Sequence, residues 1–142
     1  MKSVELNSTD SLFVFDTGEE VVSALQKLTL DRKIEGGSFT ALGAFQRAVI
    51  AYWNWDTKKY EEIEIDEQVE VLSLLGNVAR GEKGESKVHA HVTLGRRTGD
   101  AVGGHLLKGF VRPTIEMVFT RASQRLSRKR DPETKLQLLD LH

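Results

Sequence analysis

The stretch that decides the fold is Lys87-Val-His-Ala-His-Val-Thr-Leu-Gly-Arg-Arg-Thr-Gly-Asp-Ala-Val-Gly-Gly-His-Leu106. Apolar and polar residues alternate up to Leu94, which predicts a strand with one buried face. The following run, Gly95 to Asp100, is rich in glycine and polar residues and predicts a turn. Ala101 then begins a returning strand, so we expect an antiparallel hairpin.

Three of the four histidines of the chain lie in this hairpin. His89 and His91 share one face of the first strand, about 7 Å apart, because successive side chains alternate. If the turn centres on Thr98, His105 lies directly opposite His91, with Cβ atoms roughly 5 Å apart. Three imidazoles with one open position are typical of a catalytic zinc site. We therefore predict His89, His91 and His105 as metal ligands and zinc as the cofactor; the alternative is that they are structural side chains without an ion.

Composition limits the possible classes of protein. A chain of 142 residues with 39% hydrophobic content predicts a single domain over residues 1–142. A formal net charge of -1 and a pI near 6.4 argue against a dedicated DNA binder, because DNA attracts basic surfaces. The absence of cysteine excludes disulfides and a thiolate nucleophile. The N-terminal residues lack the apolar core of a signal peptide and no run approaches the ~18 apolar residues of a membrane span, so we expect a soluble cytoplasmic protein.

One helix and a series of strands are expected elsewhere. Thr17 to Glu20 predicts a capping box, and the apolar stripe from Val21 to Leu28 predicts the helix that follows. Strands are expected at residues 11–16, 39–55 with a bulge or bend at Gly43, 60–66, 68–75 and 114–120, with a last strand or short helix at 136–141. Because strands run consecutively, the predicted fold class is α+β, with a mostly antiparallel central sheet and one principal helix.

Several of these residues carry a resemblance to a known family. They are Gly37-x-Phe39-x-x-Leu42-Gly43-Ala44, Gly76-Asn77, His89-x-His91, Gly99-x-x-x-Gly103-Gly104-His105-Leu106 and Thr114-x-Glu116. This order resembles the plants-and-prokaryotes-conserved (PPC) domain, which accompanies AT-hook DNA-binding motifs in plants and stands alone in bacteria and archaea. The resemblance implies a PPC-like α+β fold, assembly as a homotrimer and a histidine site similar to a metal site. The chain lacks the Arg-Gly-Arg-Pro hook of the plant proteins.

Two further features have open interpretations. Glu116 shares a strand face with Thr114 and Val118, and if that face looks into the site, Glu116 is the candidate catalytic base or a partner that orients a histidine. The alternative is a surface or interface carboxylate. The run from Arg121 to Arg130 places five positive charges in ten residues, which predicts a solvated face or an interaction patch.

Two functional hypotheses follow. The first is a metal-dependent enzyme, a hydrolase or lyase acting on a small molecule, in which zinc lowers the pKa of a bound water to near 7. The second is a non-enzymatic regulatory or DNA-associated assembly module, in which the histidines hold a structural ion or only contact one another. We expect no specific binding of duplex DNA at physiological salt, because the chain offers one basic run and no evident groove-reading helix.

Overall fold

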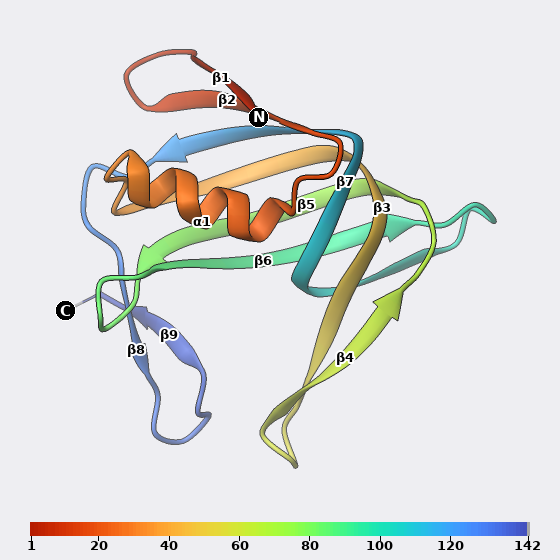
Figure 1. The fold of residues 1–142 in the computed structure, drawn as a ribbon. Helices are drawn as coiled ribbons and strands as arrows, with labels where there is room; N and C mark the ends of the chain where they lie inside the picture. Colours follow the sequence, from red (N-terminus) through yellow and green to blue (C-terminus); the bar gives the residue numbers. More distant parts are fainter. Residues whose placement is uncertain (142) are drawn as a thin grey trace.

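The fold is known from a computed structural model that describes residues 1–141 (Figure 1). The elements are β1 (Lys2–Glu5), β2 (Asp10–Asp16), α1 (Val21–Asp31), β3 (Gly36–Asn54), β4 (Lys59–Ile65), β5 (Val69–Arg80), β6 (Ser86–Gly95), β7 (Ala101–Arg121), β8 (Ser127–Arg130) and β9 (Gln137–Asp140). Within residues 1–141, no helix is long and apolar enough to cross a membrane.

The strands form one mostly antiparallel sheet in the order β1-β2-β7-β3-β5-β8-β9, with β4 paired to β3 and β6 paired to both β5 and β7. The pairings β3–β5, β5–β6, β6–β7 and β7–β3 therefore close a ring. The long strands β3 and β7 reach their several partners through register shifts, and such bulges bend a strand. The predicted bulge at Gly43 is confirmed: its φ is +141°, and a Cβ there would lie 2.2 Å from the carbonyl oxygen of Thr114.

Helix α1 covers the buried face of the sheet, where it contacts β6 and β7 (Figure 1). It begins at Val21, because the Glu20 carboxylate accepts hydrogen bonds from the backbone N–H groups of Val22 and Ser23. The predicted capping box is wrong, since the Thr17 hydroxyl instead donates to the carbonyl oxygen of Pro113. The apolar side of α1 packs into one core cluster with Phe13, Phe15, Phe45, Ile115, Met117 and Phe119.

Over residues 1–141 the protein is largely sheet with a single helix of 11 residues, rather than a balanced mixture of helix and strand. The predicted strands are present with shifted ends, so β3 begins at Gly36 and β5 continues to Arg80. The tail forms a hairpin, in which β9 is the predicted last strand and β8 was not predicted. Strand β1 also escaped prediction, because all four of its residues are exposed and it pairs only with β2.

Candidate metal centre

The β6–β7 hairpin brings the three predicted histidines together. His91 pairs directly with His105 across the hairpin, which confirms the register predicted from the turn. His89 lies two residues earlier on β6 and shares the outward face with His91. One ligand atom from each of the three imidazoles can be chosen so that all lie within 4.8 Å of one another.

The imidazole spacing suits a tetrahedral ion. The Nε2 atoms of His89 and His91 are 3.3 Å apart. Two nitrogen ligands held 2.0–2.1 Å from a tetrahedral zinc would themselves be roughly 3.3 Å apart. The ring of His105 lies 5.1 Å from that of His89 and 5.6 Å from that of His91, measured between centroids. The donor set and its spacing therefore fit a zinc ion.

The surroundings keep two of these imidazoles neutral. Burial lowers the pKa of His105 to about 4, with further lowering from the charges of His89, His91 and Arg128. Burial, and then Arg128, lower the pKa of His89 from its ordinary value. The Nδ1 atom of His105 is buried and has no hydrogen-bond partner among residues 1–141. Neutral rings with a free nitrogen are what metal ligation requires.

Aromatic side chains of the β3–β4 hairpin hold His105 in place. The Tyr60 ring lies 4.8 Å from the His105 ring, and the Trp53 ring lies 4.9 Å from that of Tyr60. Trp53 pairs with Tyr60 across the hairpin. The sequence did not connect these aromatic residues with the histidines, because the contact depends on the pairing of β3 with β7.

The two glycines before His105 allow a close approach of strands. A Cβ on Gly103 would lie 2.7 Å from the carbonyl oxygen of Val92, and one on Gly104 would lie 2.8 Å from that of Ala51. Both distances are shorter than real Cβ contacts, and both neighbours are backbone atoms. Neighbouring backbone atoms therefore fill the space that side chains at Gly103 and Gly104 would need, and no room is left there for an ion.

We expect Gly104→Ala to destabilise the protein by about 1–3 kcal/mol, because the added methyl forces the β3 or β7 backbone to move. Chemical denaturation of the purified variant measures the free energy of unfolding. Thr93→Ala, at an exposed position of the adjacent strand β6, is the matched control and should change stability by no more than about 0.5 kcal/mol. An equal free energy of unfolding for Gly104→Ala and the unaltered protein would contradict this prediction and show that the two strands can move apart at little cost.

Glu116 does not lie with the histidines. It is exposed on the second half of β7, where it pairs with Leu42 of β3 and Val14 of β2. Glu116 lies 11 residues beyond His105 along β7, in the half of that strand that pairs with β2 and the first part of β3 rather than with β6. This exposed position does not support a role for Glu116 as the catalytic base. It agrees with the alternative interpretation, a surface or interface carboxylate.

A cavity of about 520 Å³ opens beside His89 and His105. It lies between the β3–β4 and β8–β9 hairpins, which project from the same side of the sheet in Figure 1. Their turns are joined by a hydrogen bond from Lys58 Nζ to the carbonyl oxygen of Glu133, 2.7 Å long. A small molecule in this cavity would contact two of the three histidines.

Arg128 also lines this cavity, and the sequence did not single it out. It belongs to the basic run that was expected to be a solvated face or a patch, yet it is only 7% exposed. Its Nη2 donates to Asn77 Oδ1 at 2.6 Å and its Nη1 donates to the carbonyl oxygen of Gln137 at 2.7 Å. These bonds fasten the C-terminal hairpin beside the histidine strand.

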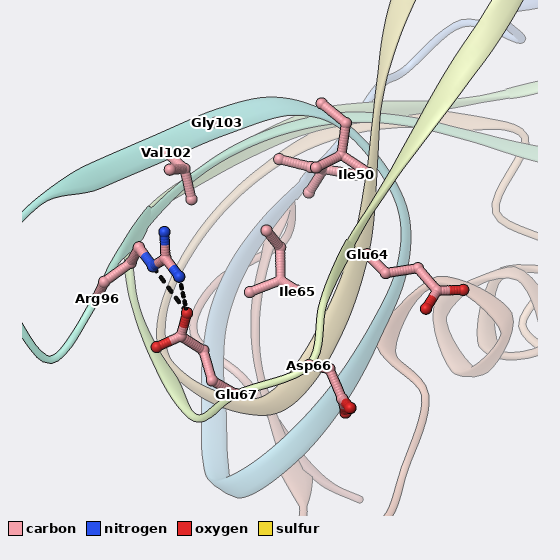
Figure 2. Close-up of a pocket in the computed structure, with 9 residues that line it drawn as sticks. Ile50, Glu64, Ile65, Asp66, Glu67, Arg96, Val102 and Gly103 are labelled. Carbon is pink, nitrogen blue, oxygen red and sulfur yellow. Dashed lines mark hydrogen bonds and ion pairs between the residues drawn. The ribbon is translucent and has the colours of Figure 1, made fainter.

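A second cavity, of about 590 Å³, has a different character (Figure 2). Arg96 points toward Glu67 there, and its Nε donates to Glu67 Oε1 at 2.7 Å. Figure 2 also shows the carboxylates of Glu64 and Asp66 directed away from this ion pair. No histidine is among the residues that line this cavity, so it is separate from the candidate metal centre.

Comparison with known proteins agrees with this fold. A structure from Bacteroides thetaiotaomicron, described as a "putative DNA binding protein", has a TM-score of 0.90 at 28% identity and covers 96% of this chain and 94% of its own. A structure from Ralstonia eutropha with the same description has a TM-score of 0.89 at 31% identity, with the same coverage. A metal-containing protein from Archaeoglobus fulgidus has a TM-score of 0.84 at 31% identity and covers 97% of this chain and 98% of its own. No curated protein matches the chain. The sequence model of the Plants and Prokaryotes Conserved (PCC) domain matches residues 5–123, and the chain therefore belongs to that family.

Proposed function

We propose that this chain is a zinc-binding protein of the family, with His89, His91 and His105 as the ligands. The observation that carries the proposal is the convergence of three imidazoles, each able to place one nitrogen within 4.8 Å of the others. The similar protein from Archaeoglobus fulgidus is metal-containing, which supports the same property here. We also propose that the whole chain forms a single domain, which one continuous core cluster supports. A cytoplasmic location is a further part of the proposal.

The function that the site supports best is a hydrolase or lyase reaction on a small molecule. Bound zinc would supply Lewis-acid polarisation of a substrate oxygen or a water. His89 and His105 line the cavity of about 520 Å³, so a substrate held there would reach the metal site directly. Tyr60 packs against His105 and fixes the plane of its ring. No aspartate or glutamate of the described residues lines this cavity, so proton transfer would depend on Tyr60 or solvent.

Elemental analysis tests this proposal. Protein purified without chelator and without a metal-affinity tag is expected to contain about one zinc per chain, since each chain provides one set of three imidazoles. The double variant His91→Ala/His105→Ala should contain almost none. Unchanged zinc content in the double variant would refute the ligand assignment.

We also propose assembly as a homotrimer. The outward face of the sheet carries exposed apolar side chains on three adjacent strands: Leu42 is 59% exposed, Leu75 54% and Val118 41%. A closed cyclic assembly would bury such a face. Size exclusion coupled to light scattering is expected to give three times the 15.9 kDa chain mass. A monomer mass at micromolar concentration would contradict the trimer.

The second candidate function is a non-enzymatic regulatory or DNA-associated module. It is favoured by the description of two similar structures as "putative" DNA-binding proteins, and those comparisons give no support to our expectation that specific DNA binding is absent. That expectation remains a prediction based on a slightly acidic chain with one basic run, Arg121 to Arg130. Fluorescence anisotropy with AT-rich and GC-rich duplexes at about 0.15 M salt checks it. Nanomolar binding that distinguishes the two duplexes would make the second candidate the better one.

A further inference from the structure

The cavity beside the histidines has an excess of positive charge. Five cationic side chains line it, namely Lys58, Lys87, Arg128, Arg130 and Lys135. Among residues 1–141, no carboxylate side chain shares the lining. Only one of the five has an ion-pair partner in the described part of the chain, since Lys87 Nζ lies 3.3 Å from Glu85 Oε1. The cavity is therefore suited to an anion and not to a cation.

Arg128 is the most unusual of these cations because it is 93% buried without a carboxylate partner in the described chain. Its two Nη atoms donate to neutral oxygens, those of Asn77 and Gln137. Its Nε is buried and has no hydrogen-bond partner among the described residues. A buried guanidinium without an opposing charge is costly, and a bound anion would remove that cost.

Unsatisfied polar atoms gather at the same place. Within residues 1–141, four buried side-chain nitrogen or oxygen atoms lack a hydrogen-bond partner, and three of them belong to residues that line this cavity: Trp53 Nε1, His105 Nδ1 and Arg128 Nε. The Trp53 and Arg128 atoms can only donate. Two buried donors without acceptors are costly, and an acceptor oxygen that reached them would remove that cost.

The other residues that line the cavity indicate the chemical character of the rest of the ligand. Trp53, Tyr60, Val88, Leu136 and Leu138 provide aromatic and apolar surface. A volume of about 520 Å³ lies within the usual range for small-molecule sites, roughly 300–1,000 Å³. The cavity thus combines charged donors with a surface suited to an apolar or flat organic body.

We propose that this cavity binds a small organic oxyanion, whose phosphate or carboxylate group pairs with the cationic side chains of the lining while its body extends toward His89 and His105. Small side-chain shifts would let the same group accept hydrogen bonds from Arg128 Nε and Trp53 Nε1, which neighbouring atoms cover in this structure. Such a molecule is the substrate class for the reaction proposed above. The inference rests on that proposed function only for the reaction, because the anion contacts do not require a metal. Arg128, Arg130 and Lys135 lie beyond residues 5–123, so this part of the anion site is built from residues outside the matched domain.

Isothermal titration calorimetry with phenyl phosphate and benzoate, at about 0.15 M sodium chloride, tests the inference on both zinc-loaded and chelator-treated protein. At least one of the two anions is expected to bind with Kd of about 1 mM or tighter in both forms. The tighter of the two identifies the preferred oxyanion. Arg128→Gln should weaken binding about tenfold to hundredfold, the usual worth of a hydrogen bond to a charged group. Lys129→Gln, the exposed neighbour on β8 that does not line the cavity, is the matched control and should bind normally.

A second variant guards against misfolding of Arg128→Gln. Trp53→Phe removes the indole donor while keeping an aromatic ring, and it should weaken binding several-fold with an unchanged circular dichroism spectrum. Absence of binding by both anions at about 10 mM, or equal binding by Arg128→Gln, would overturn the inference. Anion binding that disappears when zinc is removed would also overturn it. The same holds if neither anion binds and duplex DNA binds in a manner that requires Arg128.

The two proposals fail in different ways. Anion binding that depends on Arg128, in protein that contains no zinc, would refute the metal proposal and uphold the anion site. Zinc bound by the three histidines without any anion binding would do the reverse. Elemental analysis and calorimetry on the same preparation separate these results.

Discussion

Replacing His105 with alanine should weaken zinc binding by about two to three orders of magnitude. Zinc sites in small proteins are worth roughly 10–16 kcal/mol in total, so one of four ligands contributes about 3–4 kcal/mol. His105 is the only ligand from β7, and its loss leaves two imidazoles that lie on the same strand. Competition with a chromophoric chelator measures the zinc affinity of each variant.

Two controls make this experiment specific. Thr93→Ala removes a side chain from an exposed, outward position of β6 next to His91 and should leave zinc affinity unchanged. Circular dichroism checks that His105→Ala keeps its fold after losing the contact with Tyr60. If His105→Ala folds and binds zinc as tightly as the unaltered protein, His105 is not a ligand.

The metal-free protein should lose stability as the pH falls from about 6.5 to about 4. Burial lowers the pKa of His105 to about 4 and lowers that of His89, whereas both imidazoles in the unfolded chain titrate near 6.5. Within this pH window the unfolded chain binds more protons than the folded one, so acid favours unfolding. After allowance for partial solvent screening, we expect His105 to account for about 1–2 kcal/mol of this loss.

Thermal unfolding of chelator-treated protein at pH 7, 6 and 5 measures this dependence. His105→Gln removes the titrating group while keeping a polar side chain of similar size, and it should show a smaller loss between pH 7 and pH 5. Carboxylates titrate alike in both proteins, so the difference between them isolates His105. Parallel curves for the two proteins would mean that His105 is as accessible to protons in the folded state as in the unfolded one.

The same lowered pKa values extend zinc binding to lower pH. Protons compete with the metal for imidazole, and three ordinary histidines would begin to release zinc near pH 6. In the folded protein His89 and His105 resist protonation, so release is displaced to more acidic solution.

The histidine cluster was predictable because it depends on local geometry. Strand alternation places His89 and His91 on one face, and a short turn fixes the register that sets His105 opposite His91. The bulge at Gly43 was predictable for a similar reason, since an isolated glycine in a strand marks a bend. In both places the residues that matter are close in the sequence.

Features that depend on distant parts of the chain were not predictable. Arg128 lies in a charged run that has the pattern of a solvated face, yet it is buried and its Nη2 donates to Asn77, 51 residues away. Glu116 occupies the same long strand as His105, but it lies in the half of β7 that pairs with β2 and the first part of β3 rather than with β6. The mostly antiparallel sheet and the one principal helix were predicted correctly, but the chain is largely sheet rather than a balanced α+β fold.

X-ray absorption at the zinc edge tests the central claim most directly. For protein loaded with one equivalent of zinc, we predict scattering from three imidazole rings, with nitrogen at about 2.0–2.1 Å, and one further light atom in the open position. The geometry of His89, His91 and His105 requires that pattern, and His91→Ala/His105→Ala should lose it. A spectrum without imidazole scattering, with zinc held only by oxygen ligands, would contradict the proposed centre.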